Sequence, residues 1–235
     1  MSKKVPKKVK TKAKKQAKKI ARKHPLLTFF ILLIFVCVVV GGYYAKFYKQ
    51  PLKGEVSIHY LELGNEYAGD CIYIKSGEND ILVDAGSRAS SVETIDKYLK
   101  NHVTDGKLEY VIVTHADRDH IAGFSADNGI FDRYDCGTII DFPRTDKDTS
   151  LYKTYVEKRD AEIKDGATHY TALQCYNNSD GATRSYELAE GVTLEILYNY
   201  FYENEASSEN DYSVCFMIKQ GSRKFLFTGD LEKEG

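Results

Sequence analysis

The chain has 235 residues and a formal net charge of −1, with 33 basic and 34 acidic side chains. This balance hides a division, because residues 1–54 carry 15 lysines and arginines and no acidic residue, which leaves residues 55–235 at −16. A domain of that charge repels polyanions, which argues against a nucleic-acid-binding module with a basic face. The five cysteines lie at long, irregular spacings, which is not the pattern of a zinc knuckle.

The N-terminal part combines a basic tail, residues 1–25, with an uncharged apolar stretch, residues 26–44. As a helix rising ~1.5 Å per residue, this stretch spans roughly 28 Å, close to the thickness of a hydrocarbon core. We predict one transmembrane helix over residues 26–44, followed by a linker over residues 45–54. The positive-inside rule then predicts a cell-membrane protein with a cytoplasmic N-terminus and an extracytoplasmic domain. The helix and the basic tail would contact membrane lipids. A cleaved signal peptide is the alternative.

Residues 55–235 are enough for one domain with a sizeable core, and they alternate between strand and helix patterns. An amphipathic helix is predicted over residues 91–103, where Val92, Ile95 and Leu99 recur at helical spacing. The other predicted elements, in chain order, are strands at 56–63, 71–74, 80–84, 110–113 and 137–141, a polar helix at 150–163, and strands at 192–197, 212–218 and 224–227. The pattern indicates an α/β fold.

The strand over residues 110–113 runs directly into two histidines and two aspartates, in the sequence YVIVTHADRDH. We expect these side chains to lie on one tight loop and to converge as imidazole and carboxylate ligands of a divalent cation. The alternative is a polar loop whose aspartates cap a following helix and whose histidines are solvated. The proposed ligands in this segment are His115, Asp117, Asp119 and His120.

The HADRDH segment resembles the H-x-H-x-D-H signature of the metallo-β-lactamase superfamily, in the H-x-D-x-D-H variant of the soluble domain of ComEC-type DNA-uptake competence proteins. Four other segments match in the same order. They are IHYLELGNEYAGDCIYI at 58–74, ILVDAG at 81–86, NDYSVCFMI at 210–218 and FLFTGD at 225–230. The resemblance covers residues 55–235 and implies a metallo-β-lactamase-like αββα sandwich.

The resemblance also implies two divalent metal ions, Zn or Mn, with Asp117 in place of the usual histidine favouring oxygen-preferring ions. His115 and Asp117 would bind the first ion, and Asp119 and His120 the second. Asp117 could instead orient His115. Asp230 would bridge the two ions, a simple turn aspartate being the alternative.

The resemblance also concerns Asn210 and three further aspartates. Asn210 and Asp211 stand where many relatives place a histidine, and ordinary turn chemistry explains them nearly as well. Asp84 would brace the metal loop by hydrogen bonding. Asp70 follows a turn three residues longer than that of the competence proteins, so its role stays open.

The remaining histidines and cysteines carry no motif. A lone histidine is more often a core or surface residue than a ligand, which applies to His59, His102 and His169. An extracytoplasmic location permits disulfides, although Cys71 and Cys215 lie in apolar strand patterns and are predicted to be buried thiols.

The resemblance implies metal-dependent hydrolysis of a phosphodiester such as DNA, by a hydroxide that bridges the two ions and is oriented by Asp119 as the catalytic residue. Relatives continue past the GD segment to a final histidine, so we expect this chain to be a fragment with a weakly bound second ion and slow hydrolysis. The alternatives are a hydrolase of a lactam, lactone or small phosphodiester, and a non-catalytic membrane-anchored module with a vestigial metal site. No protein partner follows from the sequence.

Overall fold

The computed structural model describes residues 24–47, 53–64 and 69–233, in two compact units that comprise Met1–Gln50 and Pro51–Gly235. The predicted basic tail, up to residue 23, and about half of the linker lie outside the described residues.

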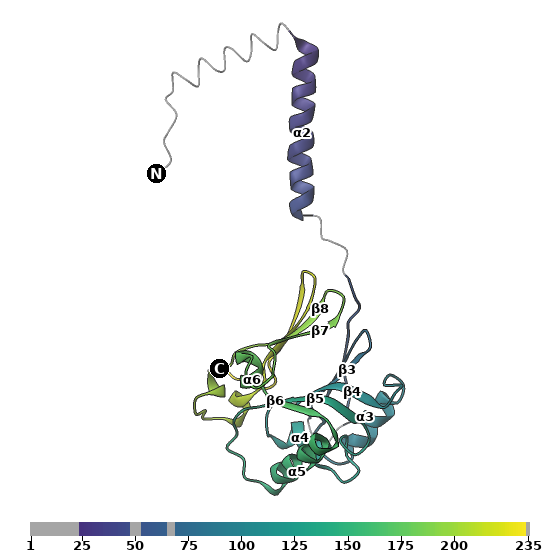
Figure 1. The fold of residues 1–235 in the computed structure, drawn as a ribbon, viewed down its shortest axis with the longest axis vertical. Helices are drawn as coiled ribbons and strands as arrows, with labels where there is room; N and C mark the ends of the chain where they lie inside the picture. Colours follow the sequence, from purple (N-terminus) through teal and green to yellow (C-terminus); the bar gives the residue numbers. More distant parts are fainter. Residues whose placement is uncertain (1–23, 48–52, 65–68, 234–235) are drawn as a thin grey trace. The chain divides into compact units, whose positions relative to one another are not determined.

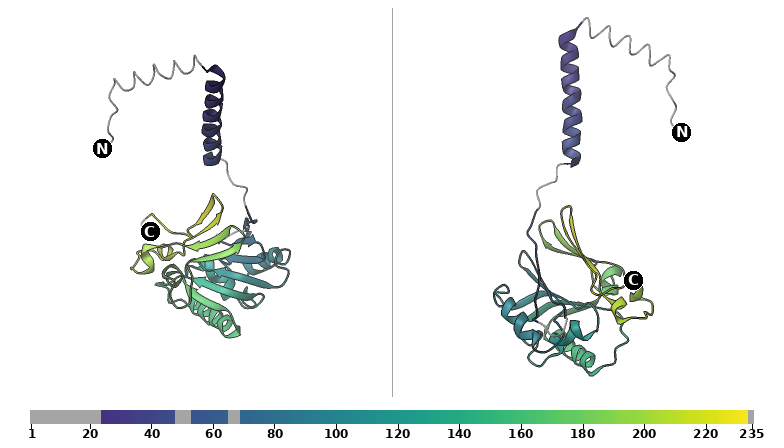
Figure 2. Two further views of the ribbon diagram at one scale, coloured as in Figure 1. Left: turned by 45° about the horizontal axis from the view of Figure 1, so that its top comes forward. Right: turned by 180° about the vertical axis from the view of Figure 1, so that it is seen from behind.

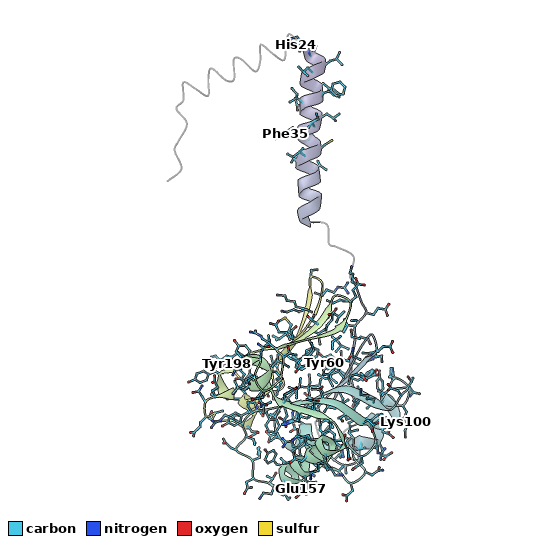
Figure 3. The ribbon with its side chains drawn as sticks, in the orientation of Figure 1. His24, Phe35, Tyr60, Lys100, Glu157 and Tyr198 are labelled. Carbon is cyan, nitrogen blue, oxygen red and sulfur yellow. The ribbon has the colours of Figure 1, made fainter. Side chains whose placement is uncertain are left out.

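The described part of the first unit is an apolar helix, α2 (Pro25–Phe47), which extends three residues beyond the predicted end. Its residues 25–42 have a mean hydropathy of 2.7, and none of this stretch is buried. Figure 3 shows Phe35 among the side chains that project from this helix. By length and composition α2 could cross a membrane, and a signal sequence would meet the same test.

The second unit is built on two β-sheets (Figure 1). The larger sheet has the order β1-β2-β3-β4-β5-β6, antiparallel from β1 to β3 and parallel from β3 to β6. Its strands are β1 (Ser57–Tyr60), β2 (Ile72–Ser76), β3 (Asn79–Val83), β4 (Lys107–Ile112), β5 (Asp135–Asp141) and β6 (Thr168–Thr171). The smaller, antiparallel sheet has the order β10-β9-β8-β7. Its strands are β7 (Ser185–Ala189), β8 (Val192–Ile196), β9 (Phe216–Gln220) and β10 (Arg223–Phe227).

Helices cover the face of the larger sheet that lies away from the smaller sheet, as the views in Figure 2 also show. The helices of this layer are α3 (Ser91–Leu99), α4 (Arg118–Ser125) and α5 (Ser150–Asp165). A shorter helix, α6 (Ala172–Asn177), follows β6 and contacts β8. Ile81, Leu82 and Val83 of β3 are almost fully buried, because this central strand has a layer on each face. The predicted α/β class is confirmed, and the outer helical layer of the αββα arrangement stays a prediction.

The two largest differences between predicted and observed bounds are the end of one helix and the start of one strand. The helix predicted over 91–103 ends at Leu99, although Val103 still donates its amide to the Leu99 carbonyl at 2.8 Å and stays buried. The strand predicted over 212–218 begins only at Phe216, because Glu209–Tyr212 forms a 3₁₀ turn and the Val214 amide donates to the Thr114 carbonyl at 2.8 Å. This last contact brings the smaller sheet to the end of β4.

The sequence patterns also missed β6, α6 and β7. Periodicity did not reveal them because β6 has four residues and α6 has six, and because β7 has five residues, of which two are exposed and polar. The four domain cysteines, Cys71, Cys136, Cys175 and Cys215, are all buried and free. Burial raises the pKa of each thiol, so these cysteines stay protonated at neutral pH.

Candidate metal centre

The site begins where the parallel strands β3 and β4 end side by side, with Val83 opposite Ile112. Asp84 follows β3 in a left-handed conformation, with φ at +58°, and is buried. Its Oδ1 accepts the Thr114 amide at 2.8 Å, and its Oδ2 accepts the Thr114 hydroxyl at 2.7 Å. Asp84 therefore ties the end of β3 to the loop after β4, which is the geometry of the brace expected from the sequence.

His120 lies in the first turn of α4, so the prediction that all four ligands share one loop is wrong for Asp119 and His120. The His120 Nδ1 atom contacts Asp84 Oδ2 at 2.8 Å, which fixes the ring and leaves Nε2 facing outward from the brace. That Nε2 atom lies 3.5 Å from Asp230 Oδ2 and 3.9 Å from Asp119 Oδ2.

His115 is fully buried, and its ring centroid lies 4.1 Å from that of His120. The His115 Nδ1 atom lies 3.1 Å from the Thr114 hydroxyl and 3.4 Å from the Ser213 hydroxyl. The buried Nε2 atom has no hydrogen-bond partner among the described residues, and Asp117 Oδ2 lies 3.7 Å from it. Buried polar atoms are rarely left without a partner, and this nitrogen lies beside a carboxylate and a second imidazole, which is a geometry suited to a cation.

Asp230 reaches the histidines from the end of β10, more than one hundred residues away in sequence. Gly229 before it has a φ of +52°, and a Cβ there would lie 2.8 Å from the Ser213 hydroxyl, so the turn requires glycine. The Asp230 amide donates to the same hydroxyl at 3.2 Å. Three ligand atoms, one each from His115, His120 and Asp230, lie within 4.8 Å of one another. These residues fit a divalent cation.

The two histidines differ in protonation. Burial, reinforced by the neighbouring His120, lowers the pKa of His115, so its ring is neutral and suited to bind a metal. Burial also opposes protonation of His120, but the charge and hydrogen bond of Asp84 outweigh it and raise the pKa of His120 to about 9. A cation that binds His120 must therefore displace a proton.

Asp117 occupies the N-cap position of α4, yet its side chain makes no capping hydrogen bond. Its Oδ1 is bound instead by Lys147 Nζ at 2.5 Å, while Oδ2 faces His115. The alternative of helix-capping aspartates and solvated histidines therefore does not describe this loop. Asp117 and Asp119 flank the group of three rather than lying within it.

Asn210 and Asp211 both form hydrogen bonds with Glu232. Asn210 Nδ2 donates to Glu232 Oε1 at 3.0 Å, and Asp211 Oδ1 accepts the Glu232 amide at 3.2 Å. The Asp211 carbonyl also accepts Asn199 Nδ2 at 2.7 Å. These bonds correspond to the turn role that the sequence left open.

The other histidines lie apart from the centre. His169 Nε2 contacts Asp141 Oδ1 at 2.8 Å, and His102 stacks on Tyr98 with centroids 4.4 Å apart. His59 Nδ1 contacts the Tyr98 hydroxyl at 2.7 Å.

Sequence reasoning missed several residues around the site. Thr114 and Ser213 supply hydroxyls to His115, and Glu209 and Lys147 contact the metal loop. Serine, threonine, lysine and glutamate are common surface residues, so spacing gave no signal for them. Asp70 donates its amide to the Asp119 carbonyl at 3.1 Å and helps to line a cavity of about 200 Å³ beside Asp84.

Comparisons with known proteins show which sequences and structures the chain is similar to. Residues 64–126 match the sequence profile of the Metallo-beta-lactamase superfamily. This metallo-beta-lactamase match includes the loop from His115 to His120 and excludes Asp230. No curated protein matches the chain significantly. The closeness to the ComEC-type competence proteins stays a prediction.

Solved structures give a weak overall likeness. The chain is 20% identical to the metallo-beta-lactamase fold protein YhfI from Bacillus subtilis, with a TM-score of 0.44 over 76% of this chain and 62% of that one. It is 14% identical to a metallo-beta-lactamase with a HARLDQ motif from Cronobacter sakazakii, with a TM-score of 0.39 over 77% and 59%. It is 17% identical to a metallo-beta-lactamase from Hirschia baltica, with a TM-score of 0.35 over 76% and 71%. The chain thus spans less than two thirds of the first two proteins.

Proposed function

We propose that the domain is a metal-dependent hydrolase, anchored to a membrane by α2, whose substrate class is phosphodiesters. The observation that carries the proposal is the buried His115 Nε2 atom, which lacks a partner among the described residues and faces a carboxylate. A second imidazole and Asp230 approach the same point. Such a mixed nitrogen and oxygen ligand set suits Zn²⁺ or Mn²⁺, and we propose that two ions bind.

Each residue of the chain has a distinct task in this proposal. His115, His120 and Asp230 hold the cation, with Asp117 and Asp119 at its margin. Asp84 holds the His120 ring through Nδ1, so that Nε2 is the ligand atom. A bound divalent cation would supply Lewis-acid activation of water and would neutralise charge on the phosphoryl oxygens. Asp119, more exposed than either histidine, accepts a proton from the attacking water and orients it.

The charge of the domain favours a small substrate over a long polyanion. Several carboxylates surround the centre, and residues 55–235 carry a net charge of −16. A small phosphodiester is therefore a second candidate beside single-stranded DNA.

A substrate panel tests the activity. The 235-residue protein, loaded with Zn²⁺ or Mn²⁺, is assayed on single-stranded DNA, bis(p-nitrophenyl) phosphate and a lactam. We expect slow, metal-dependent cleavage of the phosphodiesters that Asp119→Ala abolishes and Asp127→Ala retains, since Asp127 is exposed beyond the end of α4. Cleavage of the lactam alone would change the substrate class. Absence of metal-dependent turnover on all three would overturn the hydrolase.

Membrane anchoring has its own test. Protease treatment of intact cells should digest the domain and spare the N-terminal tail if α2 spans the membrane with the tail inside. Digestion of the tail with survival of the domain would invert the topology. A mature protein that lacks α2 would identify the segment as a signal peptide.

A further inference from the structure

Lys147 and Asp117 form an ion pair in which the two oxygens of the carboxylate have different neighbours. Lys147 Nζ lies 2.5 Å from Oδ1, while Oδ2 of the same group lies 3.7 Å from the partnerless His115 Nε2. The ammonium thus engages the oxygen that points away from the imidazole. A carboxylate held in this way presents one defined oxygen to a cation at His115.

Glu209 fixes the segment that carries Lys147 to the metal loop. Its Oε1 accepts the Ala116 amide at 3.2 Å and the Thr145 hydroxyl at 2.7 Å, and its Oε2 accepts the Asp146 amide at 3.1 Å. The Lys147 amide donates to the Thr145 hydroxyl at 3.0 Å. One glutamate therefore connects the residue before Asp117 to the two residues before Lys147.

A second contact fixes the same segment from the smaller sheet's side. The Tyr212 hydroxyl donates to Asp146 Oδ2 at 3.2 Å, and Tyr212 is fully buried. Glu209 and Tyr212 are the first and last residues of one 3₁₀ turn, and together they hold the segment before Lys147 at the Thr145 hydroxyl, the Asp146 amide and the Asp146 carboxylate. The long lysine side chain then loses less freedom when it binds Asp117 than a lysine on a free loop would.

We propose that Lys147 is a positioning residue of the metal centre, which holds Asp117 Oδ1 so that Oδ2 serves the cation bound by His115. The inference rests on the proposed metal-dependent function and adds to it a residue outside the metal loop. Ligating carboxylates are commonly oriented by such hydrogen-bonding partners. The rival role is competition, in which the ammonium occupies the place of the cation and its removal tightens metal binding.

Metal titration of the 235-residue chain distinguishes these roles, with Mn²⁺ followed by electron paramagnetic resonance. We expect Lys147→Met to weaken binding by about 10- to 100-fold, as for the loss of a partner of a ligand. Lys147→Arg should restore most of the affinity, because arginine keeps the charge and donates to a carboxylate. The matched control is Lys153→Met, which removes an exposed lysine paired with Asp148 and should leave affinity unchanged.

A double-mutant cycle tests whether Lys147 acts through Asp117. In an Asp117→Ala background, Lys147→Met should weaken Mn²⁺ binding no further. An equal loss in both backgrounds, an unchanged affinity or a tighter one would each overturn the proposal. The measurement of metal affinity does not depend on turnover. A parent chain that binds Mn²⁺ without hydrolysing any substrate would refute the proposed hydrolase activity, and the positioning role of Lys147 could still be tested. A parent chain that binds no metal would refute both.

Discussion

The carboxylate of Asp96 and the carboxylates of the metal centre have opposite surroundings. The buried Asp96 carboxylate is bound by Lys100 Nζ at 2.6 Å, Arg133 Nη1 at 2.7 Å and the Tyr134 hydroxyl at 2.9 Å. At the metal centre, the ion pairs of Asp119 and Asp230 both go to the ring of His120, at 3.9 and 3.5 Å. Asp96 is neutralised by cations of the chain itself, whereas Asp119 and Asp230 share the single imidazole of His120.

Residue type therefore does not separate a stabilising carboxylate from a metal-binding one. What separates them is whether one carboxylate oxygen is left without a donor at hydrogen-bond distance: Asp96 has donors on both oxygens, whereas Asp117 Oδ2 lies 3.7 Å from the His115 nitrogen. Around Asp96 the folded state therefore gains from the charge. Around Asp230 the nitrogen of His120 is beyond hydrogen-bond distance, which leaves coordination positions for a cation.

The largest effect should come from removing a ligand. His120→Ala is expected to lower the affinity for Mn²⁺ or Zn²⁺ by more than about 100-fold, because loss of a ligand exceeds the cost of losing its hydrogen-bond partner. His102→Ala removes a histidine that stacks on Tyr98 and should not change metal affinity. Isothermal titration calorimetry measures both. Equal losses in the two variants would refute the distinction between the sites.

Removing the brace should have the next largest effect. Asp84→Asn takes away the acceptor that orients His120 through Nδ1, so we expect a loss of metal affinity of about 10- to 100-fold. Asp80→Asn is the matched control, since Asp80 is a buried carboxylate near the other end of β3 that pairs with Lys75 at 2.8 Å. It should lower stability and leave metal affinity unchanged. A metal titration that finds Asp84→Asn unaffected would contradict the brace.

Asp96 should govern acid stability instead of metal binding. Burial opposes its ionisation, but hydrogen bonds from Lys100 and Tyr134 outweigh this and lower the pKa of Asp96 from its ordinary 3.8. Because the folded pKa is depressed, the contribution is present above the unfolded pKa and is lost as pH falls through the folded pKa. Asp96→Asn should lower the free energy of unfolding at neutral pH by about 1–3 kcal/mol.

Thermal unfolding of the parent chain and of Asp96→Asn across this acid range measures the effect. The difference between the two should close as Asp96 becomes protonated in the folded parent. A difference that stays constant down to the lowest pH would show that packing, not charge, explains the loss.

The smallest effect should follow loss of one of the cations around Asp96. The Lys100 side chain is 69% exposed, and Arg133 and Tyr134 remain bound to Asp96 when it is removed. Lys100→Met should therefore cost only about 0–1 kcal/mol, as for a solvent-exposed ion pair. Chemical denaturation checks this value. A much larger loss would mean that the neutralisation of Asp96 depends on that single lysine.

The sequence predicted those parts of the fold and the candidate site that depend on local pattern. Ile112 and Val113 lead into HADRDH, and the parallel pairing of β3 with β4 brings Asp84 beside it, as the matched segments implied. The class of fold followed from alternating strands and helices. Short or half-polar elements such as β6 and β7 gave no periodic signal.

The rest of the site depends on long-range contacts that no local pattern encodes. The Val214 amide pairs with the Thr114 carbonyl, so the expected strand begins only at Phe216, and Ser213 lies beside His115. Lys147 forms an ion pair with Asp117, and Glu209 accepts the Ala116 amide, and in both cases the partners are 30 residues or more apart in sequence. Such contacts follow from tertiary packing, so single-sequence reasoning could not place them.

The most direct test of the account is anomalous diffraction from crystals of the 235-residue protein grown with Zn²⁺ or Mn²⁺. The account predicts an anomalous peak within ~2.0–2.3 Å of Nε2 of His115, Nε2 of His120 and a carboxylate oxygen of Asp230. A peak elsewhere, or a structure in which Asp230 turns away from the two histidines in the presence of metal, would contradict it.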